Sequence, residues 1–487
     1  MESALPLLPI GIVLVTSILI MVSGKRPNLR EFWSIAGAVL TFFSVMVMVP
    51  AIWQGNRILY TLSTIAPGIS LNFRVDALSL IFGIVSSFLW IFASIYNIGY
   101  MRSLNEHAQT RYYAFFAIAI FGAQGVSYAG GLFSLYLFYE IITLFTYPLV
   151  AHHQDEEGYA GGKKYLVYLM GTSKGFLLPA LILTYVMTGT LDFADNIRTG
   201  VFPSTADPLW ITVTYVLFIA GFAKAAIMPF HNWLPSAMVA PTPVSALLHA
   251  VAVVKAGVFC IVRVMLSTFG TGVLQDLGIG LVTAYVVSFT ILAASIIALT
   301  KDDLKARLAY STVSQLSYII LGVALLDNSG VLGGIIHIVN HGFSKITLFF
   351  CAGAIYVAHH KKKISDMAGI GYAMPFTMGA FALASLSMIG APPVAGFVTK
   401  WYLLNGALEI QNIPILIVLV ASTILNAGYF VPITIRAFFE GKKERWSRKD
   451  IHEAPLTMVV PLVLASIISL VLGIFPDFFV GLIGKLF

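Results

Sequence analysis

The sequence predicts an all-α polytopic membrane protein, because its composition is strongly apolar and because long apolar runs recur along its whole length. Of its 487 residues, 58% are apolar and 10% are charged, and the mean hydropathy is +0.89. A soluble domain carries about 25% charged residues to cover its surface. The apolar runs reach about 20 residues, which suffices to cross a hydrocarbon core of about 30 Å. The chain is therefore expected to reside in a lipid bilayer.

The apolar runs predict about fourteen transmembrane helices in one bundle, because the segments between them are mostly short. The first run, residues 4–22, follows no basic residue and precedes no small-residue cleavage site, so we expect a retained helix and not a signal peptide. The longest non-helical stretch, residues 52–75, predicts a small surface hairpin. The predicted helices start near Ala4, Phe32, Asp76, Tyr112, Gly131, Gly162, Pro208, Thr242, Asp276, Ala306, Gly330, Met374, Ile413 and Pro455.

Lysine and arginine are distributed unequally between the two sets of predicted loops. Loops on one side carry 18 of the 29 basic residues, whereas loops on the other side carry 4. The positive-inside rule then places the basic loops in the cytoplasm of a prokaryotic cell and both termini on the extracytoplasmic side of its membrane. A net charge of +7 suggests nucleic acid for a soluble protein, but here the basic residues anchor loops, so nucleic acid is excluded as a partner.

Five lysines fall inside predicted spans, where each costs roughly 2.5–3.5 kcal/mol on an insertion scale. Glu140 is the one acidic residue predicted deep in a span, since Asp76, Glu409 and Glu440 lie near helix ends. One carboxylate cannot pair five ammonium groups, and burial disfavours the charged form of lysine. The pattern therefore favours proton transfer over structural ion pairing. The lysines are Lys174, Lys224, Lys255, Lys345 and Lys400, while Arg263 and Arg436 are expected to snorkel from helix ends.

His337, His341 and Lys345 recur every four residues in the eleventh predicted span, so they form one polar stripe on an apolar helix. A lone buried histidine is usually a core residue, but three titratable groups in register within a membrane indicate a proton relay. A metal site is disfavoured there, because no cysteine or acidic residue accompanies them in that span.

No cofactor is expected in this chain. Its two cysteines, Cys260 and Cys351, both lie in apolar runs, which excludes a cysteine-ligated iron–sulfur cluster and a disulfide framework. No nucleotide-binding loop, cofactor motif or quinone-specific pattern is visible. The chain itself is therefore not expected to carry out redox chemistry, and any enzymatic classification would come from the complex that contains it.

Prolines are expected to interrupt the seventh and twelfth helices beside a buried lysine. Pro229 follows Lys224 in one, and Pro392 and Pro393 precede Lys400 in the other. Two such interruptions in corresponding positions are typical of transporters built from inverted repeats. The predicted organisation has N-terminal helices in residues 1–111, five-helix repeats in residues 112–266 and 276–440, and a last helix in residues 455–487.

Three stretches carry a resemblance to a known family. One runs from Lys224 through Met-Pro-Phe-His-Asn-Trp-Leu-Pro and Ala-Pro-Thr-Pro-Val-Ser-Ala-Leu-Leu-His-Ala to Lys255; the others are Asp303-Leu-Lys-Ala-Arg-Leu-Ala-Tyr-Ser-Thr-Val-Ser-Gln-Leu and the histidine stripe. Together they resemble the antiporter-like subunits of respiratory complex I, of Mrp-type cation/proton antiporters and of membrane-bound hydrogenases. The resemblance covers nearly the whole chain.

The resemblance implies fourteen helices and a central polar axis along which protons move laterally. By position, it implies that Glu140 pairs with Lys224, and that separating them weakens the hold of the lysine on its proton. The proton would then pass to Lys400, which releases it on the other side. The implied site residues are Glu140, Lys224, His249, Lys255, His337, His341, Lys345 and Lys400.

The implied partners are other membrane subunits, and two alternatives remain open for what drives the ion movement. The chain is either coupled to a redox module, as in complex I or a membrane-bound hydrogenase, or it is the D-type large subunit of an Mrp Na⁺/H⁺ antiporter without a redox partner. Lysine and histidine favour H⁺, since Na⁺ prefers oxygen ligands, although Na⁺ could cross through a neighbouring subunit. Lys174 has no counterpart that the family pattern explains; it either neutralises a nearby carboxylate or lines a hydrated path.

Overall fold

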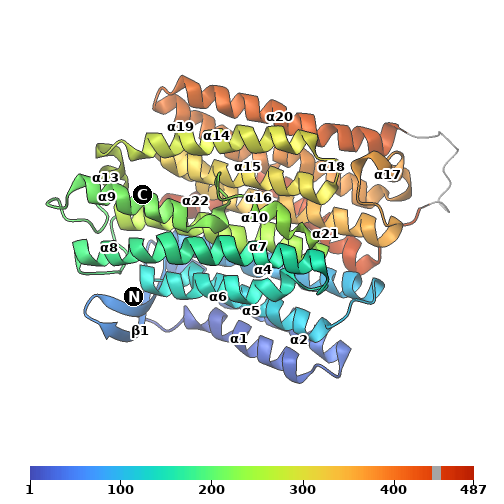
Figure 1. The fold of residues 1–487 in the computed structure, drawn as a ribbon, viewed down its shortest axis with the longest axis horizontal. Coiled ribbons are helices and arrows are strands. Elements are labelled where there is room, and N and C mark those ends of the chain that lie inside the picture. The colour runs from blue at the N-terminus through green and yellow to red at the C-terminus, as the bar shows by residue number, and fades with distance from the viewer. Residues whose placement is uncertain (441–450) are drawn as a thin grey trace.

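The structure is a computed structural model that describes residues 1–440 and 451–487. Its helices run roughly side by side along the long axis of the molecule (Figure 1). In the first half they are α1 (Leu7–Val22), α2 (Pro27–Met46), the short α3 (Val49–Trp53), α4 (Ala77–Ser103), α5 (Gln109–Tyr128), α6 (Leu132–Val150), α7 (Glu156–Thr172), the π-helical turn η1 (Ser173–Leu177), α8 (Leu178–Thr188) and α9 (Pro208–Gly221). Five basic loop residues, Lys442, Lys443, Arg445, Arg448 and Lys449, lie outside the described residues.

The helices of the second half of the chain lie side by side with those of the first half (Figure 1). Its elements are η2 (Ala223–Ala225), α10 (Trp233–Ser236), η3 (Ala237–Val239), α11 (Thr242–Ala246), η4 (Leu247–Val251), α12 (Val253–Val264), η5 (Met265–Phe269), α13 (Thr271–Asp276), α14 (Ile279–Thr300), α15 (Leu304–Ala324), α16 (Asn328–His359), η6 (Ile364–Asp366), α17 (Ile370–Ala373), α18 (Pro375–Ile389), α19 (Ala395–Glu409), α20 (Ile413–Phe439), α21 (Leu456–Ile474), α22 (Asp477–Ile483) and η8 (Gly484–Leu486).

Nine helical segments among the described residues are long and apolar enough to cross a membrane. Two of them, residues 242–269 and α16, are completely buried within the bundle over their most apolar window, whereas α20 exposes most of that window. A fully buried apolar helix lies in the interior of a bundle, and an exposed one can face lipid. The fold is thus the predicted helical membrane fold, while the count of fourteen spans and the inverted repeats stay predictions.

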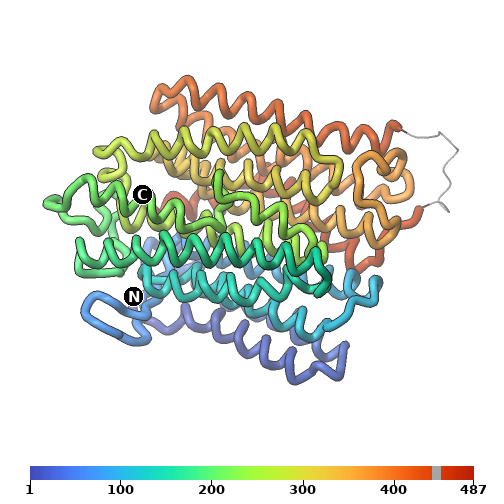
Figure 2. The backbone as a smooth tube through the Cα atoms, in the orientation of Figure 1, coloured from blue at the N-terminus to red at the C-terminus, as the bar shows by residue number. Residues whose placement is uncertain are grey.

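The predicted surface hairpin is confirmed. Strands β1 (Ile58–Ala66) and β2 (Ile69–Val75) pair antiparallel between α3 and α4. The hairpin lies at the same end of the bundle as both chain termini, opposite the end that carries α17 (Figures 1 and 2). The isolated contact of Glu2 with Leu59 fastens the N-terminus to this end.

Both predicted helix interruptions are present, but the first begins earlier than the prolines suggested. α9 ends at Gly221, so the helix is already broken before Lys224, which lies in the single turn η2; Ala226 then adopts a left-handed backbone with φ of 55°. The second interruption separates α18 from α19 at residues 390–394 and begins at Gly390, whose φ is 86°. The positive φ of Ala226 ends the turn η2 and that of Gly390 ends α18, because each turns the backbone out of the helical path.

Candidate functional site: a buried polar axis

Glu140 lies on α6 and forms an ion pair with Lys174, not with Lys224. The Oε2 of Glu140 is 3.3 Å from the Nζ of Lys174, which also donates a hydrogen bond of 2.6 Å to Tyr136. Ser173, the first residue of the π-helical turn η1, donates a short hydrogen bond to Oε1 of Glu140. Of the two alternatives for Lys174, the contact with a carboxylate is therefore confirmed.

Lys224 is fully buried at the break that follows α9. Its Nζ donates a 2.7 Å hydrogen bond to the carbonyl oxygen of Tyr139 and lies 3.0 Å from the centroid of the Tyr139 ring. Gly257 lets α12 approach this break, since a Cβ there would lie 2.4 Å from the backbone nitrogen of Ala225. The ammonium thus rests on a carbonyl and a ring face beside Glu140, without a direct carboxylate partner among the described residues.

His249 and Lys255 lie on the next buried segment, with no solvent exposure. His249 belongs to the π-helical turn η4, and its ring stacks on Phe349 of α16 at a centroid distance of 4.5 Å. Neither ring nitrogen of His249, nor the Nζ of Lys255 on α12, has a hydrogen-bond partner within the described part of the chain. π-Helical turns inside α-helices are frequent at functional sites, and unpaired buried polar groups are rare without a role.

The predicted stripe on α16 is confirmed as one buried face. The rings of His337 and His341 are 5.7 Å apart, and Nδ1 of His337 is 3.1 Å from Oγ1 of Thr399 on α19. Both nitrogens of His341 lack hydrogen-bond partners in the described ranges 1–440 and 451–487. Lys345, one turn further, donates a 2.8 Å hydrogen bond to Ser311 of α15.

A hydrogen-bonded network leads from Lys345 towards the second break. Tyr429 of α20 donates to Ser311 at 3.1 Å and lies 2.6 Å from Oδ1 of Asn426. The amide nitrogen of Asn426 in turn donates to the carbonyl of Met388, near the end of α18, at 3.2 Å. These side chains connect Lys345 to the region beside the second break through polar groups alone.

Lys400 is nine-tenths buried on α19, beside the second break. Its Nζ donates hydrogen bonds of 2.6 Å each to the carbonyl of Ile389 and to Thr423, and it lies 5.6 Å from the ring centroid of Tyr318. Like Lys224, it therefore lies over an aromatic ring and donates to a backbone carbonyl. The carbonyl of Ile389 ends the interrupted helix α18, whereas the Tyr139 carbonyl that holds Lys224 belongs to the continuous helix α6. No carboxylate in the described chain forms an ion pair with it.

Contacts between elements order these residues across the bundle. η2 with Lys224 packs on α12 with Lys255, η4 with His249 packs on α16, and α16 packs on α19 with Lys400. Glu140 joins the series at one end, because α6 carries both Glu140 and the Tyr139 carbonyl that holds Lys224. All eight predicted site residues thus lie along one chain of contacting elements.

Sequence reasoning missed the neutral groups between the charged ones, namely Tyr136, Tyr139, Ser173, Ser311, Tyr318, Thr423, Asn426 and Tyr429. Ser311 and Tyr318 could have been found from the sequence, because Ser311 belongs to the quoted α15 motif and Tyr318 follows the end of that motif by two residues. Ser173 and Thr423 carry no local signal, since a serine or threonine hydroxyl in an apolar run usually bonds to its own helix backbone.

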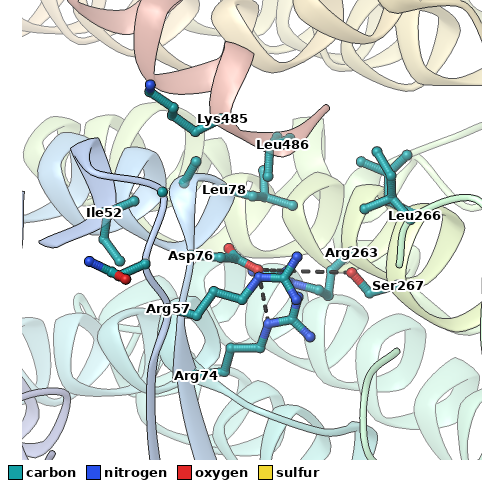
Figure 3. A pocket seen from close by; sticks show the side chains of 14 residues that line it. Ile52, Arg57, Arg74, Asp76, Leu78, Arg263, Leu266, Ser267, Lys485 and Leu486 are labelled. Carbon is teal, nitrogen blue, oxygen red and sulfur yellow. Dashed lines mark hydrogen bonds and ion pairs between the residues drawn. The ribbon is translucent and has the colours of Figure 1, made fainter. Parts of the chain in front are cut away.

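The expectation that Arg263 snorkels from a helix end is wrong. Its side chain is 1% exposed, and its Nη1 and Nη2 reach the two carboxylate oxygens of Asp76 at 2.6 and 2.8 Å. Arg74 adds a third contact to the same carboxylate at 3.2 Å. Figure 3 shows these groups converging at the hairpin end of the bundle. The two arginines hold the pKa of Asp76 well below its usual range, although burial alone would raise it.

Comparison with known proteins finds relatives of this chain in sequence and in fold. NADH-quinone oxidoreductase subunit N of Desulforudis audaxviator is 31% identical over 98% of this chain and 97% of its own length. A chain of the Mrp complex from a Dietzia species has a TM-score of 0.88 at 23% identity, with 99% of this chain and 96% of that chain covered. A chain of an archaeal membrane-bound sulfane sulfur reductase has a TM-score of 0.87 at 23% identity, with 99% and 97% covered.

The two solved structures share the fold of this protein. The family model described as NADH:quinone oxidoreductase/Mrp antiporter, transmembrane, matches residues 129–426, the part of the chain that contains every predicted site residue from Glu140 to Lys400. With that match and the full-length similarity to subunit N, the chain belongs to the NADH:quinone oxidoreductase/Mrp antiporter transmembrane family.

Proposed function

We propose that this chain is a proton-translocating, antiporter-like subunit of a multisubunit membrane complex. Protons move through the polar axis formed by Glu140, Lys224, His249, Lys255, His337, His341, Lys345 and Lys400. The single observation that carries the proposal is the row of buried amines and imidazoles between two helix breaks, of which several lack any polar partner in the described residues. Such groups are costly in a membrane, and ionisable residues inside membrane proteins mark ion pathways and proton relays.

Glu140 lies where it can control the proton on Lys224. Its carboxylate is engaged with Lys174 and Ser173, so the direct contacts of the Lys224 ammonium within the described residues are with the neutral carbonyl and ring of Tyr139. A carboxylate near an ammonium favours the charged form. Rotation of Glu140 towards Lys224 would therefore retain the proton there, and return to Lys174 would release it towards Lys255.

The full-length relative and one fold neighbour favour coupling to a redox module. The full-length relative is named as a subunit of an NADH-quinone oxidoreductase, and one fold neighbour comes from a respiratory reductase complex. The chain would then move protons while partner subunits carry the electrons. The alternative is the D-type large subunit of an Mrp Na⁺/H⁺ antiporter, which the other fold neighbour supports. The two differ in whether transport needs an electron donor or a Na⁺ gradient.

We also propose the topology that the basic residues predict, with both termini on the extracytoplasmic side and inverted repeats in residues 112–266 and 276–440. The common position of both termini at the hairpin end supports termini on the same side of the membrane (Figure 1), and the distribution of basic residues supports the choice of the extracytoplasmic side. The buried Lys224 and Lys400, each beside an interrupted helix, support the second. Cysteine labelling of exposed positions at Leu62 and Lys363 from each side of sealed vesicles would distinguish the two orientations.

Proton movement in vesicles tests the function directly. In the native complex reconstituted with a pH-sensitive dye, Glu140→Ala and Lys224→Ala should each reduce proton movement to below about one-hundredth of the wild-type rate while the complex still assembles. Lys25→Ala, in an exposed loop, is the matched control and should leave the rate unchanged. Full proton movement by either axis variant would refute the relay. His341→Ala should slow transfer without abolishing assembly.

A further inference from the structure

Three histidines and one glutamate gather at the end of the bundle opposite the hairpin. Glu106 and His107 lie in the loop between α4 and α5, and His152 and His153 lie in the loop between α6 and α7. Ligand atoms of Glu106, His107 and His152 all lie within 4.8 Å of one another. This cluster is outside the polar axis, and the proposed proton path does not use it.

His152 supplies a second observation that indicates a ligand. Its side chain is completely buried, and neither ring nitrogen has a hydrogen-bond partner among the residues that the structure describes. Its Nε2 is 3.6 Å from Oε2 of Glu106, which is too long for a hydrogen bond. A histidine that serves only as a packed core residue normally satisfies at least one nitrogen, so the unsatisfied nitrogens of this buried imidazole, beside a carboxylate and a second imidazole, indicate that it can bind a further ligand.

Two further histidine rings lie close to Glu106 and His152. Nδ1 of His153 is 3.7 Å from the same Oε2 of Glu106, and the ring of His107 is centred 4.7 Å from that of His152. The backbone of both loops is held in place: Arg111 donates to the carbonyl of His152 at 3.0 Å. In a tetrahedral zinc site the ligand atoms lie about 3.4 Å apart. The ligand atoms of Glu106, His107 and His152 lie within 4.8 Å of one another, so small side-chain shifts would bring these three into that geometry.

We propose that Glu106, His107 and His152, with His153 as a fourth ligand, bind a divalent transition metal ion and thereby join the α4–α5 and α6–α7 loops. Imidazole with one carboxylate is the donor set of Zn²⁺ and its neighbours in the first transition row, whereas Mg²⁺ and Ca²⁺ prefer oxygen donors. The site lies at the edge of a cavity of about 540 Å³ that Glu106 and His153 help to line.

Metal binding by the full-length chain tests this site. The chain is purified in detergent with a tag that contains no histidine, stripped with chelator and titrated with Zn²⁺ by calorimetry and with Co²⁺ by visible absorption. One ion should bind per chain, and the Co²⁺ spectrum should report nitrogen and oxygen ligands in tetrahedral geometry.

His107→Ala and Glu106→Gln are the informative variants, because neither residue is fully buried and neither lies in a helix. Each should weaken Zn²⁺ binding at least about tenfold. His360→Asn is the matched control, since His360 is an exposed histidine at the same end of the bundle with a left-handed backbone that asparagine tolerates. Sub-stoichiometric binding by the wild type, or equal affinity of the wild type and both variants, would overturn the proposal.

Discussion

The buried carboxylate of Asp76 is expected to be one of the most sensitive single positions for stability. It accepts hydrogen bonds from Arg263 at 2.6 and 2.8 Å and from the backbone of Ser79 at 3.0 Å, and it contacts Arg74 at 3.2 Å. Asp76→Asn keeps the helix cap of α4 but removes the charge that neutralises two buried guanidinium groups. Leaving a buried charge without its partner costs about 3–5 kcal/mol, so this variant should lose that much free energy of unfolding.

A double-mutant cycle isolates the pair. Arg263→Met alone should cost less, about 2 kcal/mol, because Asp76 keeps Arg74 and the Ser79 amide. The double variant Asp76→Asn/Arg263→Met should cost at least about 1.5 kcal/mol less than the sum of the single variants, since one of the two buried guanidinium groups is then absent and only Arg74 loses its carboxylate. Denaturant unfolding of the purified protein in detergent measures all three values.

An exposed ion pair provides the control for the same substitution. Asp195 contacts Arg57 at 2.8 Å and Arg74 of the same cluster at 3.5 Å, but its side chain is 82% exposed. Asp195→Asn should therefore cost less than about 1 kcal/mol. Losses of Asp76→Asn and Arg263→Met that add within about 0.5 kcal/mol in the double variant would refute the reasoning, because independent sites add.

Three further predictions concern the axis and the helix that carries its histidines. Tyr429→Phe removes the hydroxyl that links Ser311 to Asn426; proton movement in vesicles should slow by about tenfold or more, and an unchanged rate would exclude this branch from the path. Gly257→Ala forces a Cβ to within 2.5 Å of the backbone of Lys224. This variant should therefore lose about 1–3 kcal/mol of free energy of unfolding, measured by denaturant unfolding; unchanged stability would show that α12 shifts to accommodate the methyl group. Burial and the neighbouring Glu409 raise the pKa of Asp327, at the start of α16, to about 6. The folded state therefore binds this proton more tightly than the unfolded chain, and the associated stability is present at low pH and lost as the pH rises from 3.8 to about 6. Asp327→Asn cannot ionise and should flatten the dependence of stability on pH in that window; an unchanged slope would contradict the assignment.

Much of the candidate site was predictable because a membrane makes each charge informative. In hydrocarbon, an unpaired lysine is so costly that its presence in an apolar run already indicates function. The period of a helix then places His337, His341 and Lys345 on one face without any knowledge of the fold. Proline and glycine beside Lys224 and Lys400 likewise predict broken helices, although the structure was needed to show that the first break precedes Lys224.

Other features depend on contacts between residues far apart in the chain, which no local pattern records. The helical membrane fold and the identity of the buried amines could be read from the amino-acid order alone, because hydrophobic length and helical period are local properties. The packed bundle was required to establish that Glu140 is paired with Lys174, that Arg263 is neutralised by Asp76, and that two loops bring His107 and His152 together. Those pairings follow from how the helices pack, since a side chain pairs with what lies within a few ångströms of it and not with what is near in sequence.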